Sequence, residues 1–463
     1  MLFSSLLFLF LFLPLVLGVY YLLPKRFRNA FLFLANLVFY GFGEPIFILL
    51  MLFSVAVNWA GGLWIARCRA ASRQRRLAVT VTVAVNLLIL GVFKYAGLIS
   101  DTLRLIPPLA GLPVVEIPLP IGISFYTFQA MSYVIDVARG DCEPQRSVLR
   151  FGTYISLFPQ LIAGPIVRYK DVAQQLEDPN RESAGMFNRG VEIFLVGLGK
   201  KVLLANTMGS LWVVLSADPA ASGLLGAWLG ILVFGLQIYF DFSGYSDMAR
   251  GLGQMFGFTF CENFNYPFIA QSVAEFWRRW HMSLTTWFRD YVYIPLGGNR
   301  KGFARTLLNI ALVWTLTGLW HGASWNFLLW GVYYGIVLIL ERLFLGKLLD
   351  RLPRVLRHVY TIVMVSLGWT LFAIDRLSDS LKYLSALVTP GGMAPTVRTQ
   401  VLAYLPMFLA ACLACLPAGR SLYLKLPERP RRLVTGVLGL LALVLCTGAL
   451  VSDSYNPFLY FRF

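Results

Sequence analysis

The stretch "TLLNIALVWTLTGLWHGASWNFLLWGVYYGIVLIL", residues 306–340, contains 35 residues without a charged side chain. A helix rises about 1.5 Å per residue, and about 20 apolar residues are enough to cross a bilayer. The stretch is therefore too long for one crossing. It predicts two helices, or one helix broken near Gly318 and Gly322, in an integral membrane protein.

The whole chain fits this interpretation. Of its 463 residues 58% are hydrophobic and 14% are charged, and the mean hydropathy is +0.68. We therefore predict an all-α polytopic membrane protein with roughly ten or more crossings in one integral domain, residues 1–463. The first run lacks a basic leader and a cleavage site, so we expect a retained anchor and no signal peptide. Apolar runs occur near 2–22, 30–41 with 45–66, 77–99, 119–137, 190–215, 223–242, 304–345, 358–375, 400–418 and 433–451.

The net charge of +17 has an ordinary origin in such a protein. Basic residues follow the first run at 25–28 and the third at 67–76, and cytoplasmic loops retain Lys and Arg. Both loops can be cytoplasmic only if the N-terminus lies outside. The sequence holds no nucleic-acid-binding motif. Its six cysteines include Cys412 and Cys415 in an apolar run, where we expect small hydrophobic side chains and no metal site.

Two apolar segments look interrupted. Residues 151–170 contain Pro159, Gly164 and Pro165, which predicts a broken or re-entrant segment shielded from lipid. Residues 240–258 combine Asp241 and Asp247 with four glycines, which predicts an irregular, polar-lined substrate passage. The alternative is that the two aspartates only cap the start of a helix.

His321 lies near the middle of the uncharged stretch, and we expect it deep in the membrane. An ionisable group there is costly and is a candidate functional residue. A neutral imidazole can accept a proton near pH 7, as a general base acting on a hydroxyl would. The alternative is a histidine that only packs between helices.

A second histidine, His281, lies in "FWRRWHMSLTTWFRDYVYIPLGGNR", residues 276–300. On a continuous helix, His281 would share one face with Trp277 and Leu284. Arginines of this stretch can reach water, while Trp280 and Trp287 suit a membrane interface. We expect an interfacial helix that dips inward from the cytoplasmic surface. A solvated amphipathic helix without a chemical role is the alternative.

Five sequence blocks resemble the signature of the membrane-bound O-acyltransferase family, in its bacterial polysaccharide branch. They are "EFWRRWHMSLTTWFRDYVYIPLGGNR", "LPIGISFYTFQAMSYVIDV", "LIAGPIVRY", "YFDFSGYSDMARGLG" and "GLWHGASWNFLLWG", and the ending "YNPFLYFRF" is also similar. The resemblance implies a ring of transmembrane, re-entrant and interfacial helices around a central tunnel. The signature core would span about 117–345, and C-terminal helices would follow over about 355–463.

The resemblance further implies that His321 is the catalytic histidine at the tunnel constriction and that His281 is the second signature polar residue. Acetyl would come from cytoplasmic acetyl-CoA, with no metal, and would be passed across the bacterial inner membrane for O-acetylation of an exopolysaccharide. Alginate is the first candidate polymer, and cellulose or another polymer the alternative. The remaining partners would be membrane lipid and a periplasmic acetyltransferase or esterase of the SGNH type.

Two reaction orders are open. His321 could deprotonate an acceptor hydroxyl that attacks the thioester, with His281 polarising or positioning the carbonyl, or an acetyl-enzyme intermediate could form. The basic cluster would recruit the phosphates of CoA, or would only anchor the topology. The candidate substrate-binding residues are Trp277, Arg278, Arg279, Arg289, Asn299, Arg300, Asp241 and Tyr245.

Two other function classes compete with the acyltransferase. A transporter or flippase would use His321 with Asp241 or Asp247 as a proton relay. A scaffold for a polymer-secreting complex would tolerate loss of both histidines.

Overall fold

The computed structural model describes residues 1–452 and 458–459, and these residues form helices joined by turns and loops. Within them, eight helices are long and apolar enough to cross a membrane, and Phe8–Leu22 is a shorter apolar helix. The polytopic all-α prediction is confirmed, with fewer such helices than the ten or more expected. The runs expected at 119–137 and 190–215 are helical but are not among the eight. The eight are Ile48–Arg67, Arg73–Arg104, Pro219–Met255, Phe303–His321, Trp325–Leu349, Arg354–Ala373, Pro395–Ala414 and Glu428–Ser452.

The described chain divides into two compact units. The first comprises residues 1–194 and 248–261, and the second comprises 195–247 and 262–463. Each is described below by itself.

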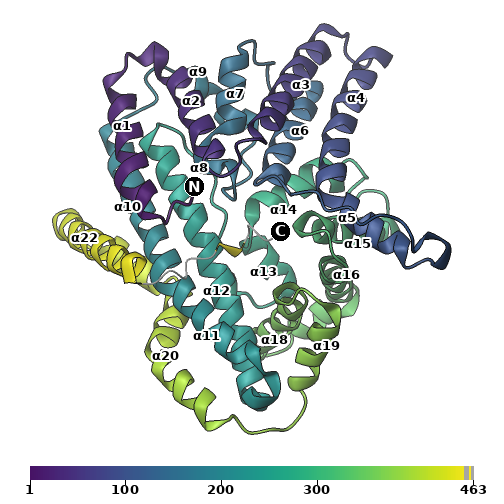
Figure 1. Ribbon diagram of the computed structural model, residues 1–463, viewed down its shortest axis with the longest axis vertical. Coiled ribbons are helices and arrows are strands. Elements are labelled where there is room, and N and C mark those ends of the chain that lie inside the picture. The colour runs from purple at the N-terminus through teal and green to yellow at the C-terminus, as the bar shows by residue number, and fades with distance from the viewer. Residues whose placement is uncertain (453–457, 460–463) are drawn as a thin grey trace. The chain divides into compact units, whose positions relative to one another are not determined.

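In the first unit, α3, α4 and α6 pack side by side (Figure 1). Beside them, Phe8, Phe12, Phe39 and Phe158 form an aromatic cluster with ring centroids 5.2 to 6.2 Å apart. Through Phe8 and Phe12, this cluster packs one face of the first apolar run against the rest of the unit. The helices are α1 (Leu13–Leu22), α2 (Arg28–Gly41), α3 (Ile48–Arg67), α4 (Arg73–Leu90), α5 (Ala96–Arg104), α6 (Ile123–Arg139), α7 (Val148–Ser156), α8 (Phe158–Leu161), α9 (Tyr169–Glu177) and the first part of α10 (Ala184–Gly199).

The predicted interruption in 151–170 is confirmed. Helix α7 ends at Ser156, the short α8 begins with Pro159 in its first turn, and residues 162–168 are not helical. This segment is buried, so its backbone needs internal partners. Tyr154 donates to the carbonyl of Val167 at 2.9 Å, and Gln160 donates to the carbonyl of Tyr154 at 2.6 Å. Side chains of the segment, together with Asn36, which accepts from the Phe158 amide at 3.0 Å, therefore supply partners to its irregular backbone.

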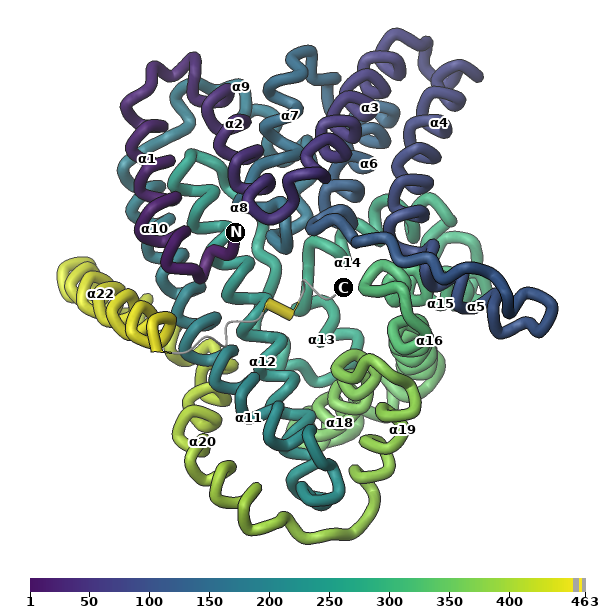
Figure 2. The backbone as a smooth tube through the Cα atoms, viewed as in Figure 1, coloured from purple at the N-terminus to yellow at the C-terminus, as the bar shows by residue number. Residues whose placement is uncertain are grey.

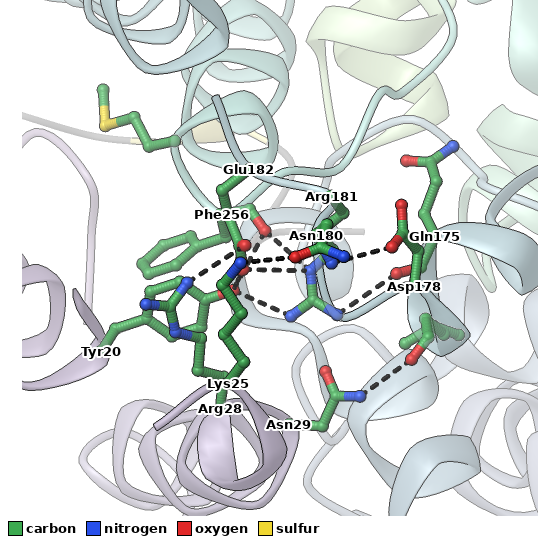
Figure 3. Close-up of polar contacts among 12 residues, drawn as sticks. Tyr20, Lys25, Arg28, Asn29, Gln175, Asp178, Asn180, Arg181, Glu182 and Phe256 are labelled. Carbon is green, nitrogen blue, oxygen red and sulfur yellow. Dashed lines mark hydrogen bonds and ion pairs between the residues drawn. The ribbon is translucent and has the colours of Figure 1, made fainter. Parts of the chain in front are cut away.

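A polar network joins the start of α2 to the loop before α10 (Figure 3). Arg28 forms an ion pair with Glu182 at 3.1 Å, and Tyr20 donates to the same carboxylate. Arg181 donates to the carbonyl of Phe256 at 3.0 Å. Arg28 was expected only as a charge in a basic loop, but its guanidinium is largely buried in this network and holds the unit together.

In the second unit, α15 and α16 form an antiparallel pair (Figure 2), α18 packs on α16, and α20 packs on α11. Helix α15 ends at His321 and α16 begins at Trp325, so the prediction of two helices in 306–340 is confirmed. The helices are the end of α10, α11 (Asn206–Ala217), most of α12 (Pro219–Met255), α13 (Val273–Arg279), α14 (Met282–Phe288), α15 (Phe303–His321), α16 (Trp325–Leu340), α17 (Gly346–Leu349), α18 (Arg354–Ala373), α19 (Leu377–Ala386), α20 (Pro395–Ala414), α21 (Ala418–Lys425) and α22 (Glu428–Ser452).

Short π-helical and 3-10 segments extend several of these helices. The π-helical segments are η1 (Phe8–Phe12), η3 (Gly91–Tyr95), η5 (Lys200–Ala205), η7 (Arg289–Tyr293) and η8 (Glu341–Leu345), and the 3-10 segments are η2 (Lys25–Phe27), η4 (Pro107–Leu109) and η6 (Pro267–Ile269).

The α15–α16 pair depends on a glycine contact. A Cβ atom on Gly331 would lie 2.4 Å from the carbonyl oxygen of Trp314, and one on Gly318 would lie 2.3 Å from that of Phe327. Small residues allow such close approach of helices in a membrane. The two glycines therefore set the spacing of the hairpin that ends at His321.

Gly331→Ala should destabilise the protein by about 1–3 kcal/mol, because the helices must separate or bend to admit the methyl group. Thermal unfolding in detergent measures this effect. Gly335→Ala is a matched control on the same helix, since its Cβ would meet the nearest atom at 3.3 Å. Equal losses in both variants would contradict the role of the close contact.

The prediction of an irregular backbone at 240–258 is wrong for residues 240–255, which are helical. Helix α12 has a break at Gly223 and is then uninterrupted over 224–255, so Asp241 and Asp247 lie in its middle and cap no helix start. The polar residues face partners: Asp241 pairs with Lys201 at 2.9 Å and Asp247 with Lys200 at 2.6 Å. A glycine here serves close packing, because a Cβ on Gly244 would lie 2.7 Å from the carbonyl oxygen of Gly197.

Candidate active site

His281 lies at a break between two short helices. Helix α13 ends at Arg279, α14 begins at Met282, and His281 has the left-handed backbone angle φ of +44°. The expected continuous helix is therefore wrong, and Trp277, His281 and Leu284 do not share one helical face. A positive φ is unusual for a non-glycine residue and costs of order 1–3 kcal/mol.

Asn263 holds this strained turn in place. Its carbonyl accepts a hydrogen bond from the Met282 amide at 2.9 Å. Its side-chain Oδ1 accepts from the amide and hydroxyl of Ser283, at 3.2 and 2.9 Å, and lies 3.1 Å from Nδ1 of His281. Because the Ser283 amide is a fixed donor, the atom facing His281 is the Asn263 oxygen, so Nδ1 carries the hydrogen.

Burial keeps the His281 ring neutral. Its residue is 2% exposed, and desolvation lowers the pKa of His281 from 6.5 to about 3. With Nδ1 protonated, Nε2 of the neutral ring is an acceptor. His281 in this state can accept a hydrogen bond, but it cannot donate one from Nε2 to a carbonyl oxygen.

This lowered pKa predicts a loss of stability in acid. Below about pH 6.5 the unfolded ring takes up a proton that the folded ring refuses down to about pH 3, so stability falls as the pH falls through this window. When the pH is lowered from about 7 to about 4, the melting temperature of His281→Gln should fall by less than that of the wild type. His358→Gln, at the third histidine, is the control. Equal acid sensitivity in His281→Gln and the wild type would contradict the assignment.

His321 is the last residue of α15, next to the turn at 322–324. The middle of the uncharged stretch is thus the place where α15 ends and α16 begins. The position of His321 in the sequence therefore does not place it at the centre of a membrane-spanning helix. The ring is nevertheless only 3% exposed. Its centroid lies 5.0 Å from both Trp320 and Trp330 and 5.4 Å from Phe372, so aromatic side chains enclose it.

The two histidines meet at one tryptophan. The ring of Trp320 lies 5.8 Å from His281 and 5.0 Å from His321, between centroids. The ring of Phe242, from α12, also packs against His281, with the two centroids 4.7 Å apart. The structure therefore brings together two imidazole side chains, from residues 40 apart in the sequence, in an apolar setting.

The tryptophans of the 276–300 stretch are core residues. Trp277, Trp280 and Trp287 are 6%, 1% and 5% exposed, so the expected interfacial position of Trp280 and Trp287 is wrong. Trp277 contacts Trp330 at 5.4 Å and Trp280 contacts Trp369 at 5.1 Å. For Trp277 and Trp280, packing against α16 and α18 outweighs the advantage of placing their N–H groups at an interface, and Trp287 packs on Phe288 and Tyr291.

Some of the polar residues predicted to bind acetyl-CoA form ion pairs within the protein, and others are exposed. Arg279 forms two short contacts with Glu275, both 2.9 Å, and donates to the carbonyl of Asn265. Arg289 pairs with Asp290 at 2.7 Å. Arg278, Asn299 and Arg300 are exposed. The structure does not gather these side chains into one cluster with the histidines.

Asp241 and Tyr245 face residues 458–459. The amide of Leu459 donates to Oδ2 of Asp241 at 2.9 Å, and the ring of Phe458 stacks on Tyr245 with centroids 4.6 Å apart. Both α12 residues are 2% exposed. Their observed partners are thus a segment of this chain and Lys201. The rest of the similar ending, 453–457 and 460–463, lies outside the described residues.

The cysteines are all free, and Cys412 is exposed while Cys415 is buried. Among residues 1–452 and 458–459, no group of three or more His, Cys, Asp and Glu side chains has an arrangement that could hold a metal ion.

Reasoning from the sequence missed Asn263, Trp320 and Trp330. Trp320 and Trp330 flank His321 in the quoted block, so their large rings were visible as a signal. Asn263 had no such signal, because its contact with His281 depends on the path of the chain between α12 and α13.

The chain is similar along its whole length to known proteins. It is 38% identical to the protein named "Probable alginate O-acetylase AlgI" of Azotobacter vinelandii, over 100% of both chains. It is 42% identical to the protein of the same name of Pseudomonas aeruginosa, over 84% of this chain and 75% of that one. It is 32% identical to "Peptidoglycan O-acetyltransferase" of Helicobacter pylori, over 85% of this chain and 81% of that one.

The family pattern of the membrane-bound O-acyltransferases, MBOAT, matches residues 144–347, which contain both histidines and the helices that position them. The resemblance noted in the sequence blocks is confirmed. The chain therefore belongs to the membrane-bound O-acyltransferase family and is an acyltransferase with multiple transmembrane helices.

Proposed function

We propose that the protein transfers acetyl from cytoplasmic acetyl-CoA across the bacterial inner membrane, for O-acetylation of an exopolysaccharide. Alginate is the first candidate polymer, since the relatives with full-length similarity carry that substrate in their names. A periplasmic acetyltransferase or esterase of the SGNH type would complete transfer to the polymer. The observation that carries the proposal is the contact of His281 and His321 with the single ring of Trp320.

His321 is the proposed general base. It takes the proton of the acceptor hydroxyl while the hydroxyl oxygen attacks the thioester carbonyl carbon. The carbon–sulfur bond then breaks, and His321 gives the proton to the departing sulfur, so that CoA leaves as the thiol and the imidazole is neutral again. The aromatic enclosure of His321 supports this role, because water is kept from the thioester and the imidazole.

His281 is the proposed positioning partner. Its neutral ring, with Nδ1 committed to Asn263, offers Nε2 as an acceptor. This geometry supports orientation of the acceptor hydroxyl and disfavours the role of polarising the carbonyl, which needs a donor. The hydrogen bond to Asn263 fixes both the tautomer and the orientation of the His281 ring.

One observation disfavours the transporter alternative. Asp241 and Asp247 each pair with a lysine of η5, so both carboxylates already have partners within the protein. The donor-binding roles of Trp277, Arg279, Arg289, Asn299 and Arg300 remain predictions.

The test is transfer of labelled acetyl from acetyl-CoA by the full chain in vesicles, with and without polymer and a periplasmic acetyltransferase. We expect CoA release and label in the acceptor. If no acceptor is added and label stays on the protein, the reaction proceeds through an acetyl-enzyme intermediate. A wild-type protein that releases no CoA and moves no label would overturn the proposed function.

A further inference from the structure

A pocket of about 570 Å³ lies among α13, α15, α16 and α18 of the second unit. Its size falls within the range of small-molecule sites. Ile310, Trp314, Leu338 and Leu349 supply apolar walls, and Arg278, Arg342 and Arg357 supply positive charge. Only Arg278 of these residues was singled out in the sequence.

The two glutamates that line the pocket already have partners within the protein. Both oxygens of Glu341 accept backbone amides, from Val273 at 2.7 Å and Ala274 at 2.9 Å. Glu275 accepts from Gln271 and pairs with Arg279; burial opposes ionisation, but these hydrogen bonds lower the pKa of Glu275 below its ordinary value. Two of the three carboxylates lining the pocket are therefore committed to the protein's own groups.

Two guanidinium groups remain available. Arg278 and Arg342 are exposed, and neither makes a hydrogen bond or a close ion pair with any of residues 1–452 and 458–459. Arg357 is half-buried, with its nearest carboxylate, Asp350, 3.8 Å away. Guanidinium groups at the mouth of a pocket suit phosphate, which they can bind with two parallel hydrogen bonds.

The pocket also points toward His321. Trp314, in its wall, lies seven residues before His321 on α15, which is two turns or roughly 10 Å along the helix axis. Trp330 lies between them, with its centroid 6.1 Å from Trp314 and 5.0 Å from His321. A ligand anchored at the arginines would therefore reach the His321 side of the pocket at Trp314, with the buried ring of Trp330 between it and the histidine.

We propose that this pocket binds the phosphate-bearing end of the acyl donor, with Arg278 and Arg342 contacting its phosphates. This inference rests on the proposed function. It adds Arg342 to the candidate residues for binding acetyl-CoA. It also separates Arg278, which would contact the donor, from Arg279, which forms an ion pair with Glu275. The thioester end of the donor extends past Trp314 toward His321.

The test is steady-state CoA release by the full chain in vesicles, at varied acetyl-CoA. Arg342→Ala and Arg278→Ala should each raise KM about tenfold with little change in kcat, as expected for loss of a charged hydrogen bond to bound donor. Arg342→Lys should recover part of the loss. Arg354→Ala is the matched control, an exposed arginine of α18 outside the pocket, and should keep the wild-type KM.

Binding of CoA alone, followed by tryptophan fluorescence, should weaken in the same two variants and separates this inference from the proposed function. Wild-type transfer with an unchanged KM in both variants would overturn the pocket assignment alone. No transfer by the wild type, with no binding of CoA, would overturn both.

An anionic lipid headgroup offers the same phosphate chemistry. The kinetic comparison is therefore repeated in vesicles of phosphatidylcholine alone and with phosphatidylglycerol added. If Arg342→Ala changes only the response to phosphatidylglycerol and leaves the KM for acetyl-CoA intact, the pocket is a lipid site and the donor assignment is wrong.

Discussion

His321→Ala should reduce acetyl transfer by about a hundredfold or more, because positioned general-base catalysis contributes on the order of 10²–10⁴. His321 is 3% exposed, and the aromatic side chains of Trp320, Trp330 and Phe372 that enclose it cannot act as a general base in its place. Label transfer from acetyl-CoA, measured at saturating donor, gives the loss in kcat.

The control is His358→Ala, at the remaining histidine. His358 faces the carbonyl of Ala270 at 2.9 Å and lies outside the aromatic enclosure of His321. The His321→Ala protein should still fold and elute like the wild type, because the change lies at a helix end and leaves both helices in place, although the cavity among the aromatic rings should lower its melting temperature. Full activity in well-folded His321→Ala protein would remove this residue from the mechanism.

Asp241→Ala should cost about 3–5 kcal/mol of folding stability, because it leaves the Lys201 charge buried without its counter-charge. Lys201 and Asp241 side chains are each 2% exposed, and their atoms lie 2.9 Å apart. The change also removes the acceptor of the Leu459 amide. Thermal unfolding in detergent measures the loss, and limited proteolysis should show earlier cleavage near residues 458–459.

Asp247→Ala is the matched control for this prediction. It removes the neighbouring pair with Lys200, whose side chains are 26% and 19% exposed, and should cost about 1 kcal/mol or less. Joint replacement by Lys201→Met and Asp241→Leu should recover much of the stability, since no charge then stays buried. If Asp241→Ala cost no more than Asp247→Ala, the buried pair would not stabilise the fold as described.

The local sequence predicted several elements correctly for physical reasons that act over a few residues. The length of the uncharged stretch required two helices in 306–340, and the turn at 322–324 that separates them begins at Gly322. Pro159 and the Gly164–Pro165 pair cannot continue a helix, and the segment is broken there. Both histidines stood out because an ionisable ring is costly in apolar surroundings.

The failures share a cause in tertiary contacts. Tryptophan is common at membrane interfaces, but Trp280 and Trp287 are buried, and Trp280 packs against Trp369 of α18. The aspartates of α12 suggested an irregular passage, yet Lys200 and Lys201 neutralise them and the helix stays regular. His281 was placed on a continuous helix, whereas Asn263 holds it in a strained turn.

Hydropathy, segment length and helix-breaking residues thus determined that this chain is a polytopic helical membrane protein with two unusual histidines. Only the tertiary structure decided that the histidines share Trp320, that Asp241 holds Lys201 and Leu459, and that Arg278 and Arg342 line one pocket. Such pairings join residues 40 to more than 200 positions apart. Periodicity is a local property of the chain, whereas these contacts depend on how whole helices pack.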